Sequence, residues 1–375
     1  MKIQFKKDRK FMSIRNALVA GAFSMLLTLV VACGGYSSKT QPPVTAAAQF
    51  AYVANAFDSS ISTYLLDTNT GNLQGTNVVS SGGLTPFSVV ADPSAHFLFV
   101  ANFHSASVAA FRIDATLGTL TSVGAPVASG VGPRALAITP NGNFLYSANE
   151  NGGTVSAFAV NPTTGVLTPI GTAIAAGLNP FSVVVDPLGR FVYVASRGDD
   201  TVSAFKINAQ TGALTAIGIP VAVTSGPSFV TVHPSGKFAY VVGSSSSTTV
   251  FSIDQATGTL FHVNDVPSGV SAVAMAVETT GKFAYIANFN DSSISVFSIN
   301  QTTGDLTLID TTATGSTPTS VNADPTGHFL YSANFGSNNV SIFRIDATTG
   351  RLIAVASPVA AGVNPVSVFT TGKVQ

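Results

Sequence analysis

The chain is poor in cysteine, tryptophan and charge: 375 residues contain one cysteine, no tryptophan, 17 basic and 17 acidic residues. A single cysteine excludes a disulfide framework and any zinc or iron–sulfur site built from several cysteines. Removing the six basic residues and Asp8 of residues 1–15 leaves 11 basic and 16 acidic residues, a mildly acidic body. Because nucleic-acid binding needs clustered lysine and arginine, we expect no nucleic-acid partner.

An uncharged, largely apolar stretch, residues 16–32, follows the basic start. It is short and basic on one side only, a pattern that indicates a secretory signal rather than a transmembrane helix. The run Val30-Val31-Ala32-Cys33-Gly34 resembles the lipobox of bacterial lipoproteins, which implies lipidation of Cys33. An ordinary cleaved signal or a retained anchor is the alternative.

We therefore predict a signal peptide at residues 1–32 and a flexible tether at 33–49 that starts from lipidated Cys33. The lipid would be the protein's only contact with the membrane. Gly34 rather than aspartate after the cysteine resembles the outer-membrane sorting pattern, so we expect an exported lipoprotein of the outer membrane or facing the periplasm.

One aromatic-rich phrase that ends in small residues recurs seven times, finishing at Asn55, Asn102, Asn149, Ser196, Gly243, Asn288 and Asn334. Intervals of 45 to 47 residues are typical of propeller blades, because each blade buries its faces only against its neighbours. We therefore predict an all-β fold, a seven-bladed β-propeller of four-stranded antiparallel blades over residues 50–375.

Two aromatic positions alternate within the phrase, which is the period of a strand. The first position is always phenylalanine: Phe50, Phe97, Phe144, Phe191, Phe238, Phe283 and Phe329. The second, two residues later, holds Tyr52, Phe99, Tyr146, Tyr193, Tyr240, Tyr285 and Tyr331. We assign both sets to the core between blades.

Turns and chain ends repeat as well. An aspartate or asparagine four residues before a glycine, as Asp67 before Gly71, predicts a hairpin with a side-chain-bonded start and a positive φ at its end. The first repeat lacks its innermost strand, and residues 365–371 match the innermost strand at 86–92. The C-terminal strand should therefore complete the first blade and close the ring, which removes an open sheet edge.

The phrase Tyr-Val-Ala-Asn, followed by Val-x-x-Phe and Thr-Gly-x-Leu, resembles the YVTN and lactonase-type seven-bladed propellers, the group of bacterial 6-phosphogluconolactonase and the carboxymuconate cycloisomerases. The lactonase branch typically carries Gly-Pro-Arg-His before one inner strand and Asn-Glu after the next. Here the matching segments are Gly132-Pro133-Arg134-Ala135 and Asn149-Glu150. The resemblance implies a lactone-hydrolysing carboxylic ester hydrolase, but Ala135 replaces the histidine and leaves catalysis open.

Residues that break the repeat around the channel are the candidate site. Glu150 and Arg197 occupy, in two adjacent repeats, a position that is otherwise apolar or small, and Arg134 is the only charge at the start of an innermost strand. His104 lies in a loop of the preceding repeat. Lactone hydrolysis needs a base and a fixed positive charge, roles that we assign to Glu150 or His104 and to Arg134 or Arg197. The alternative is a salt bridge between Glu150 and an arginine that seals the channel, or charges in solvated loops.

The sequence predicts no cofactor and no metal site. Gly130–Ala135 superficially matches a dinucleotide-binding glycine pattern, but it leads into a strand rather than a helix. Asp58, Asp199 and Asp200 have the oxygen ligands that calcium prefers but form no complete ligand loop, so we interpret them as solvated loop acids.

Two functions remain open. The first is an exported, lipid-anchored lactonase-like propeller that hydrolyses or binds a small anionic lactone or sugar-derived ligand at the channel mouth. Export separates it from cytosolic metabolites, so we do not expect a phosphorylated sugar lactone as substrate. The second is a non-catalytic cell-envelope module that presents its loops to a protein or glycan, with the protein partner unknown. The near-uniform repeats, Ala135 in place of the histidine and the expected lipid anchor favour the second function, and the charges at 134, 150 and 197 favour the first.

Overall fold

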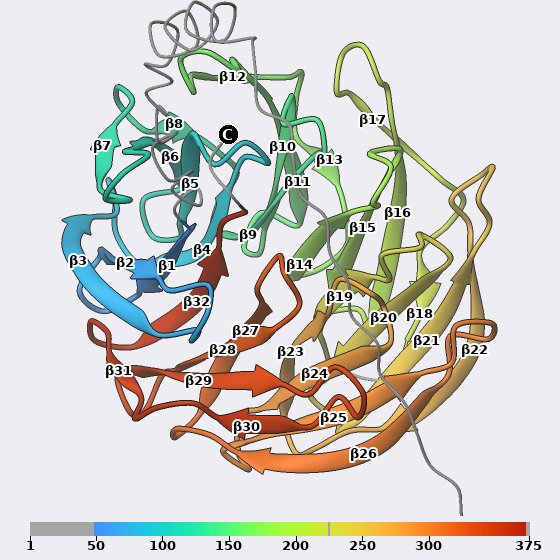
Figure 1. Cartoon of the computed structure of the whole chain (residues 1–375). Helices are drawn as coiled ribbons and strands as arrows, with labels where there is room; N and C mark the ends of the chain where they lie inside the picture. The colour runs from blue at the N-terminus through green and yellow to red at the C-terminus, as the bar shows by residue number, and fades with distance from the viewer. Residues whose placement is uncertain (1–48, 224–225, 373–375) are drawn as a thin grey trace, which may run out of the picture. The chain divides into compact units, whose positions relative to one another are not determined.

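The computed structural model describes residues 49–223 and 226–372 (Figure 1). The predicted signal peptide, the lipidation site Cys33 and nearly all of the predicted tether lie outside these residues. Every regular element in the described part of the chain is a β-strand. In that part, no helix is found with the length and apolar character needed to cross a membrane.

Seven antiparallel sheets stand around a central channel, which confirms the predicted seven-bladed propeller (Figure 1). The innermost strands of blades 1 to 7 are β32 (Pro365–Thr370), β4 (Pro86–Ala91), β9 (Pro133–Ile138), β14 (Pro180–Val185), β19 (Pro227–Val232), β23 (Ala272–Val277) and β27 (Pro318–Ala323). The second strands carry the repeated phrase and are almost wholly buried: β1 (Gln49–Asn55), β5 (Phe97–Asn102), β10 (Phe144–Asn149), β15 (Phe191–Ser196), β20 (Phe238–Gly243), β24 (Phe283–Asn288) and β28 (Phe329–Asn334).

The third strands are β2 (Ser60–Leu66), β6 (Ser107–Ile113), β11 (Thr154–Val160), β16 (Thr201–Ile207), β21 (Ser247–Ile253), β25 (Ser293–Ile299) and β29 (Asn339–Ile345). Each forms a short hairpin with the second strand of its blade, and these hairpins surround one end of the channel, which we call the mouth. Each innermost strand starts at the mouth, because its first residue pairs with the last residue of the second strand, as Pro133 does with Asn149.

The outermost strands depart from the simple four-stranded prediction. Blades 1, 5 and 6 have continuous outer strands, β3 (Leu73–Ser80), β22 (Leu260–Pro267) and β26 (Leu306–Ala313). In the other four blades two short pieces pair with the third strand: β7 (Leu120–Ser122) and β8 (Val127–Ala128), β12 (Leu167–Pro169) and β13 (Ile174–Ala175), β17 (Leu214–Ala216) and β18 (Val221–Ala222), β30 (Leu352–Ala354) and β31 (Val359–Ala360). Glycines with positive φ, such as Gly124, interrupt three of them, and Pro358, which has no N–H for a ladder, precedes β31.

The C-terminal strand closes the ring as predicted. β32 pairs antiparallel with β1, with Val53 opposite Val368, and the Phe50 N–H donates to Thr371 Oγ1 at 3.0 Å. The same strand also bonds to both neighbouring blades, since Val368 N–H donates to Ser320 Oγ at 3.2 Å and Val89 N–H donates to Ser367 Oγ at 3.4 Å. Residues from the two ends of the chain therefore complete one blade.

A glycine contact couples each blade to the next. The predicted hairpin glycine has a positive φ, and a Cβ added to it would overlap the ring of the first phenylalanine in the preceding blade; for Gly212, at φ +71°, that atom would lie 2.3 Å from Phe144 Cδ1. The pattern holds around the ring for Gly71, Gly118, Gly165, Gly212, Gly258, Gly304 and Gly350. Only glycine satisfies both the backbone conformation and the close approach.

The tyrosine two residues after that phenylalanine binds the same glycine. Its hydroxyl donates to the glycine carbonyl, as Tyr146 does to Gly212 at 2.9 Å. Five further bonds of this kind, at 2.8 to 3.0 Å, start from Tyr52, Tyr193, Tyr240, Tyr285 and Tyr331. Burial raises the pKa of each of these tyrosines, so the hydroxyls remain protonated donors. In blade 2, Phe99 has no hydroxyl to offer Gly165.

This exception gives a paired test. Phe99→Tyr should add the missing bond to Gly165 and stabilise the protein by about 1 kcal/mol, whereas Tyr146→Phe should destabilise it by a similar amount. Urea unfolding of both variants and the parent measures the two changes. A destabilised Phe99→Tyr variant would mean that blades 2 and 3 pack differently from the other six pairs.

Candidate functional site

A cavity of about 460 Å³ occupies the mouth, a size suited to a small molecule. Two residues of every innermost strand line it, the second and the third. The second residues are Phe87, Arg134, Phe181, Ser228, Val273, Thr319 and Val366, and the third are Ser88, Ala135, Ser182, Phe229, Ala274, Ser320 and Ser367. Arg197, Ser244, Ser271, Phe289 and Asn290 reach the cavity from the loops.

The loops at the mouth are held in one geometry. The residue before each innermost strand has a positive φ, as in Thr85, Gly132 and Asn179. Its carbonyl accepts the N–H of the residue that follows the second strand: Glu150 N–H donates to Gly132 at 2.8 Å, and Arg197 N–H donates to Asn179 at 2.9 Å. These bonds place Glu150 beside the start of its own innermost strand, where Arg134 lies.

The asparagine at the end of the repeated phrase is fully buried and ties the loops together. Asn149 Nδ2 donates to Thr154 Oγ1 at 3.1 Å and to Ser156 Oγ at 3.0 Å, and Asn149 Oδ1 accepts from Ser129 Oγ at 2.9 Å. The asparagine is therefore part of the frame of the site and is not a free ligand-binding group.

The structure brings Arg134 and Glu150 together. Arg134 Nη1 donates to Glu150 Oε2 at 2.9 Å, and the side chains are 25% and 17% exposed. This is the salt bridge that the sequence left open as a structural alternative. Arg134 lines the cavity and Glu150 stands behind it, because Glu150 is not among the lining residues.

Two phenylalanines enclose Arg134. Its guanidinium carbon lies 4.5 Å from the ring centroid of Phe87 and 3.5 Å from that of Phe181. Phe87 and Phe181 occupy the position of Arg134 in the two adjacent blades, so the repeat itself sets this spacing. Burial lowers the pKa of the Arg134 guanidinium, the carboxylate of Glu150 opposes that shift, and Arg197 adds to it. The rings and the ion pair together hold the cation in place.

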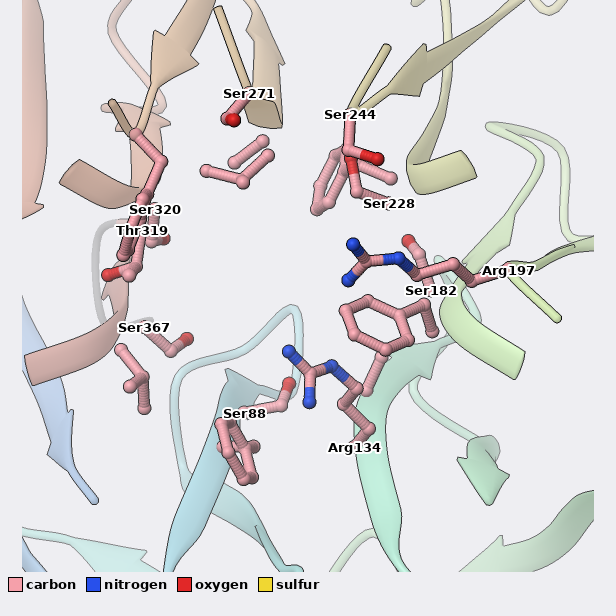
Figure 2. A pocket seen from close by; sticks show the side chains of 18 of the residues that line it. Ser88, Arg134, Ser182, Arg197, Ser228, Ser244, Ser271, Thr319, Ser320 and Ser367 are labelled. Carbon is pink, nitrogen blue, oxygen red and sulfur yellow. The ribbon is translucent and has the colours of Figure 1, made fainter. Parts of the chain in front are cut away.

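Arg197 contacts the same ring as Arg134. Its guanidinium carbon lies 5.0 Å from the ring centroid of Phe181. Figure 2 shows the guanidinium groups of Arg134 and Arg197 pointing into the cavity from neighbouring strands and loops. In the described part of the chain no carboxylate pairs with Arg197. The sequence placed Glu150 and Arg197 on adjacent blades. In the structure Glu150 pairs with Arg134, and Arg134 and Arg197 contact the same ring, that of Phe181.

His104 lies at the edge of this cluster. Its Nδ1 is 2.8 Å from Thr85 Oγ1, and its ring packs edge-on against Phe103, which in turn packs against Phe87. The imidazole is exposed and is not among the residues that line the cavity. Of the four predicted site residues, Arg134 and Arg197 line the cavity, Glu150 contacts Arg134, and His104 reaches the lining residue Phe87 only through Phe103.

The loop aspartates act on the backbone. Asp199 Oδ2 accepts from Leu178 N–H at 3.0 Å, Asp200 Oδ1 from Gly226 N–H at 2.7 Å, and Asp58 Oδ2 from Val363 N–H. Asp291 makes the equivalent bond to Val270 at 2.8 Å. These acids therefore fix the loops that lead into the innermost strands. Within the described ranges no group of three or more His, Cys, Asp or Glu residues is placed to hold a metal.

Sequence reasoning missed the aromatic and hydroxyl residues of the site. Phe87 and Phe181 could have been found, because they occupy the position of Arg134 in the repeats before and after it. The serines gave no such signal, because serine is common throughout the chain.

The protein is therefore a seven-bladed propeller whose mouth cavity is lined on one side by two arginines and two phenylalanines. The chain matches the family model described as "Lactonase, 7-bladed beta-propeller" over residues 21–130, 107–185, 127–276 and 179–369. It belongs to this lactonase family of seven-bladed propellers. Among curated proteins, none matches the chain significantly.

Solved structures share the fold. A candidate 6-phosphogluconolactonase from Bacteroides uniformis is 21% identical, with a TM-score of 0.79, and the match covers 86% of this chain and 99% of that one. A candidate 6-phosphogluconolactonase from Bacteroides fragilis is 22% identical, with a TM-score of 0.79 over 88% and 100% of the two chains. The periplasmic gluconolactonase of Pseudomonas aeruginosa is 20% identical, with a TM-score of 0.75 over 87% and 99%. At these identities the likeness shows the fold alone.

The contribution of the Arg134–Glu150 ion pair to the free energy of unfolding can be measured directly. Glu150→Gln removes the charge that faces Arg134 and should cost about 1–2 kcal/mol of unfolding free energy, because both side chains are largely shielded from water. The matched control is Asp310→Asn, which alters an exposed pair with Arg351 at 3.8 Å and should cost less than about 0.5 kcal/mol. Equal losses in urea unfolding would contradict the view that the Arg134–Glu150 pair is held in a shielded site.

Proposed function

We propose that this protein is a lactone hydrolase of the propeller type, with the mouth cavity as its active site. The observation that carries the proposal is the pair of guanidinium groups, Arg134 and Arg197, which line one cavity from adjacent blades and both contact the ring of Phe181. A fixed positive charge is what the developing oxyanion of a lactone carbonyl requires. Family membership and the relatives' lactonase names support the same reaction class.

The reaction would use Arg134 and Arg197, which line the cavity, and Glu150, which lies behind Arg134. The lactone carbonyl oxygen lies against the guanidinium groups, and water attacks the carbonyl carbon. Glu150 Oε2 is bound to Arg134, and Oε1 has no hydrogen-bond partner in the described part of the chain, so Oε1 would be the base for a water that reaches it beside Arg134. The ring C–O bond then breaks, the alkoxide takes a proton from Glu150, and the product is a hydroxy acid.

The test is a panel of five- and six-membered sugar lactones, with proton release recorded against spontaneous hydrolysis. We expect hydrolysis by the parent protein, and a fall in kcat of about 100-fold or more for Glu150→Gln and for Arg134→Ala. Arg351→Gln is the control: this arginine is exposed and does not line the cavity, so the variant should keep full activity. No activity on the panel, or activity that survives both site substitutions, would contradict the proposal. Absence of activity would favour the alternative function, a non-catalytic module of the cell envelope.

We also propose that the chain is exported and anchored through lipidated Cys33, on the support of the basic start, the apolar stretch at 16–32 and the Val-Val-Ala-Cys sequence. In a bacterial host, the parent protein should incorporate labelled palmitate and partition into the detergent phase of Triton X-114. Cys33→Ser should lose both properties. Unlabelled parent protein in the aqueous phase would contradict the anchor.

A further inference from the structure

A β-bulge near the start of every innermost strand directs its second residue into the cavity. In blade 4, Pro180 lies opposite Ser196 and Ser182 lies opposite Ala195, so the pairing skips Phe181. The same skip occurs at the second residue of the other six innermost strands. Bulges commonly turn a side chain toward a site, and these second residues line the cavity. The backbone therefore fixes the direction from which the Phe181 ring enters it.

The backbone of Arg197 is fixed, but its guanidinium has no polar partner in the described part of the chain. Arg197 N–H donates to the Asn179 carbonyl at 2.9 Å. The nearby carboxylate of Asp199 accepts the N–H of Leu178 at 3.0 Å instead of pairing with the arginine. An exposed arginine without a partner samples many rotamers. The contact with the Phe181 ring, at 5.0 Å, is therefore what limits the direction of the guanidinium.

Like charge favours movement of Arg197 away from Arg134. Burial is the largest cause of the lowered pKa of Arg134, and repulsion by Arg197 lowers it further. Arg134 is held by Glu150 at 2.9 Å and by the ring of Phe181 at 3.5 Å, so Arg197 is the cation that is free to turn toward solvent. Its contact with the same ring opposes that movement.

The two arginines are not equivalent toward a ligand. The charge of Arg134 is largely compensated by Glu150, whereas Arg197 has no carboxylate partner in the described residues. Figure 2 shows the guanidinium of Arg197 directed into the cavity. An oxyanion is stabilised most by a charge that is already oriented and not already paired. Arg197 meets the second condition by itself and the first through Phe181.

We propose that Phe181 is the positioning residue of the mouth cavity, and that it orients Arg197 so that this guanidinium, rather than that of Arg134, receives the oxyanion. Arg134 has a different role, because together with Glu150 it holds the ring of Phe181 in place. The assignment of the oxyanion rests on the proposed function. The orientation of Arg197 by Phe181 does not, and can be measured without any reaction.

The chain offers a matched pair of rings for the test. Phe87 and Phe181 are the second residues of their innermost strands, and both contact Arg134. Among the described residues, Phe181 is the ring that also contacts Arg197. Phe181→Leu and Phe87→Leu therefore remove the same group from equivalent positions and differ in their effect on Arg197.

The first measurement is NMR spectroscopy of protein labelled with ¹⁵N-arginine, in which the Nε–H signal of Arg197 is assigned from its loss in Arg197→Lys. In the parent protein the ring current of Phe181 should displace this signal, and the heteronuclear NOE should show restricted motion. Phe181→Leu should lose the displacement and make the side chain mobile. Phe87→Leu should keep both properties, and so should Phe181→Tyr, which retains the ring.

The second measurement is the hydrolysis of lactones. Arg197→Ala should lower kcat about 100-fold, because it removes the charge that faces the oxyanion. Phe181→Leu should lower kcat about tenfold with little change in KM, because the charge remains but its orientation in the transition state is lost. Phe181→Tyr should restore the rate, and Phe87→Leu should stay within about threefold of the parent. Thermal melting of each variant checks that it is folded.

The outcomes separate this inference from the hydrolase proposal. If Phe181→Leu alone releases Arg197 and the parent hydrolyses no lactone, the positioning role of Phe181 is supported and only the hydrolase proposal fails. An Arg197 signal that is the same in Phe181→Leu as in the parent would overturn the inference, even when lactones are hydrolysed. So would an equal effect of Phe87→Leu and Phe181→Leu on that signal, or hydrolysis at the full rate by Arg197→Ala.

Discussion

The structure depends on the contact between a hairpin glycine of one blade and the phenylalanine and tyrosine of the blade before it. The glycine needs its positive φ, has no room for a Cβ against the phenyl ring, and in six of the seven cases gives its carbonyl to the tyrosine hydroxyl. Because the contact recurs at every junction, including the one between Tyr331 and Gly71 that joins the last blade to the first, it imposes one spacing on all seven blades. The sequence of a blade can therefore vary only at residues that take no part in these contacts.

The residues at the mouth can vary because they lie outside these contacts. The regular spacing of the blades fixes where each varied side chain lies. The positive-φ residue before each innermost strand accepts the N–H that follows the second strand and holds these strands at the same height, so equivalent residues from adjacent blades become neighbours around the channel. Phenylalanine, arginine and phenylalanine at one position of three successive blades therefore form a stack, with Arg197 added from the loop. Substitutions at one repeated position therefore make the cavity asymmetric, while the architecture of the blades stays the same.

The fold could be predicted almost completely from the sequence, because period, aromatic alternation and hairpin glycines all describe contacts between equivalent residues. The site could be predicted only in part. Arg134, Glu150 and Arg197 were visible as breaks in the repeat, but their partners depend on side-chain directions: Arg134 pairs with Glu150, Arg197 stacks on Phe181, and His104 bonds to Thr85. The split outer strands also escaped prediction, since they follow from the hydrogen-bond geometry of individual blades.

The central claim is that the few irregular residues of a regular ring define one ligand site at the channel mouth. A crystal structure of the protein soaked with D-gluconate, the hydroxy acid that a six-membered sugar lactone yields, tests it most directly. The account predicts the ligand in the mouth cavity, with an oxygen within hydrogen-bond distance of the Arg134 or Arg197 guanidinium. A ligand bound elsewhere on the propeller, or an empty mouth at saturating ligand, would contradict it.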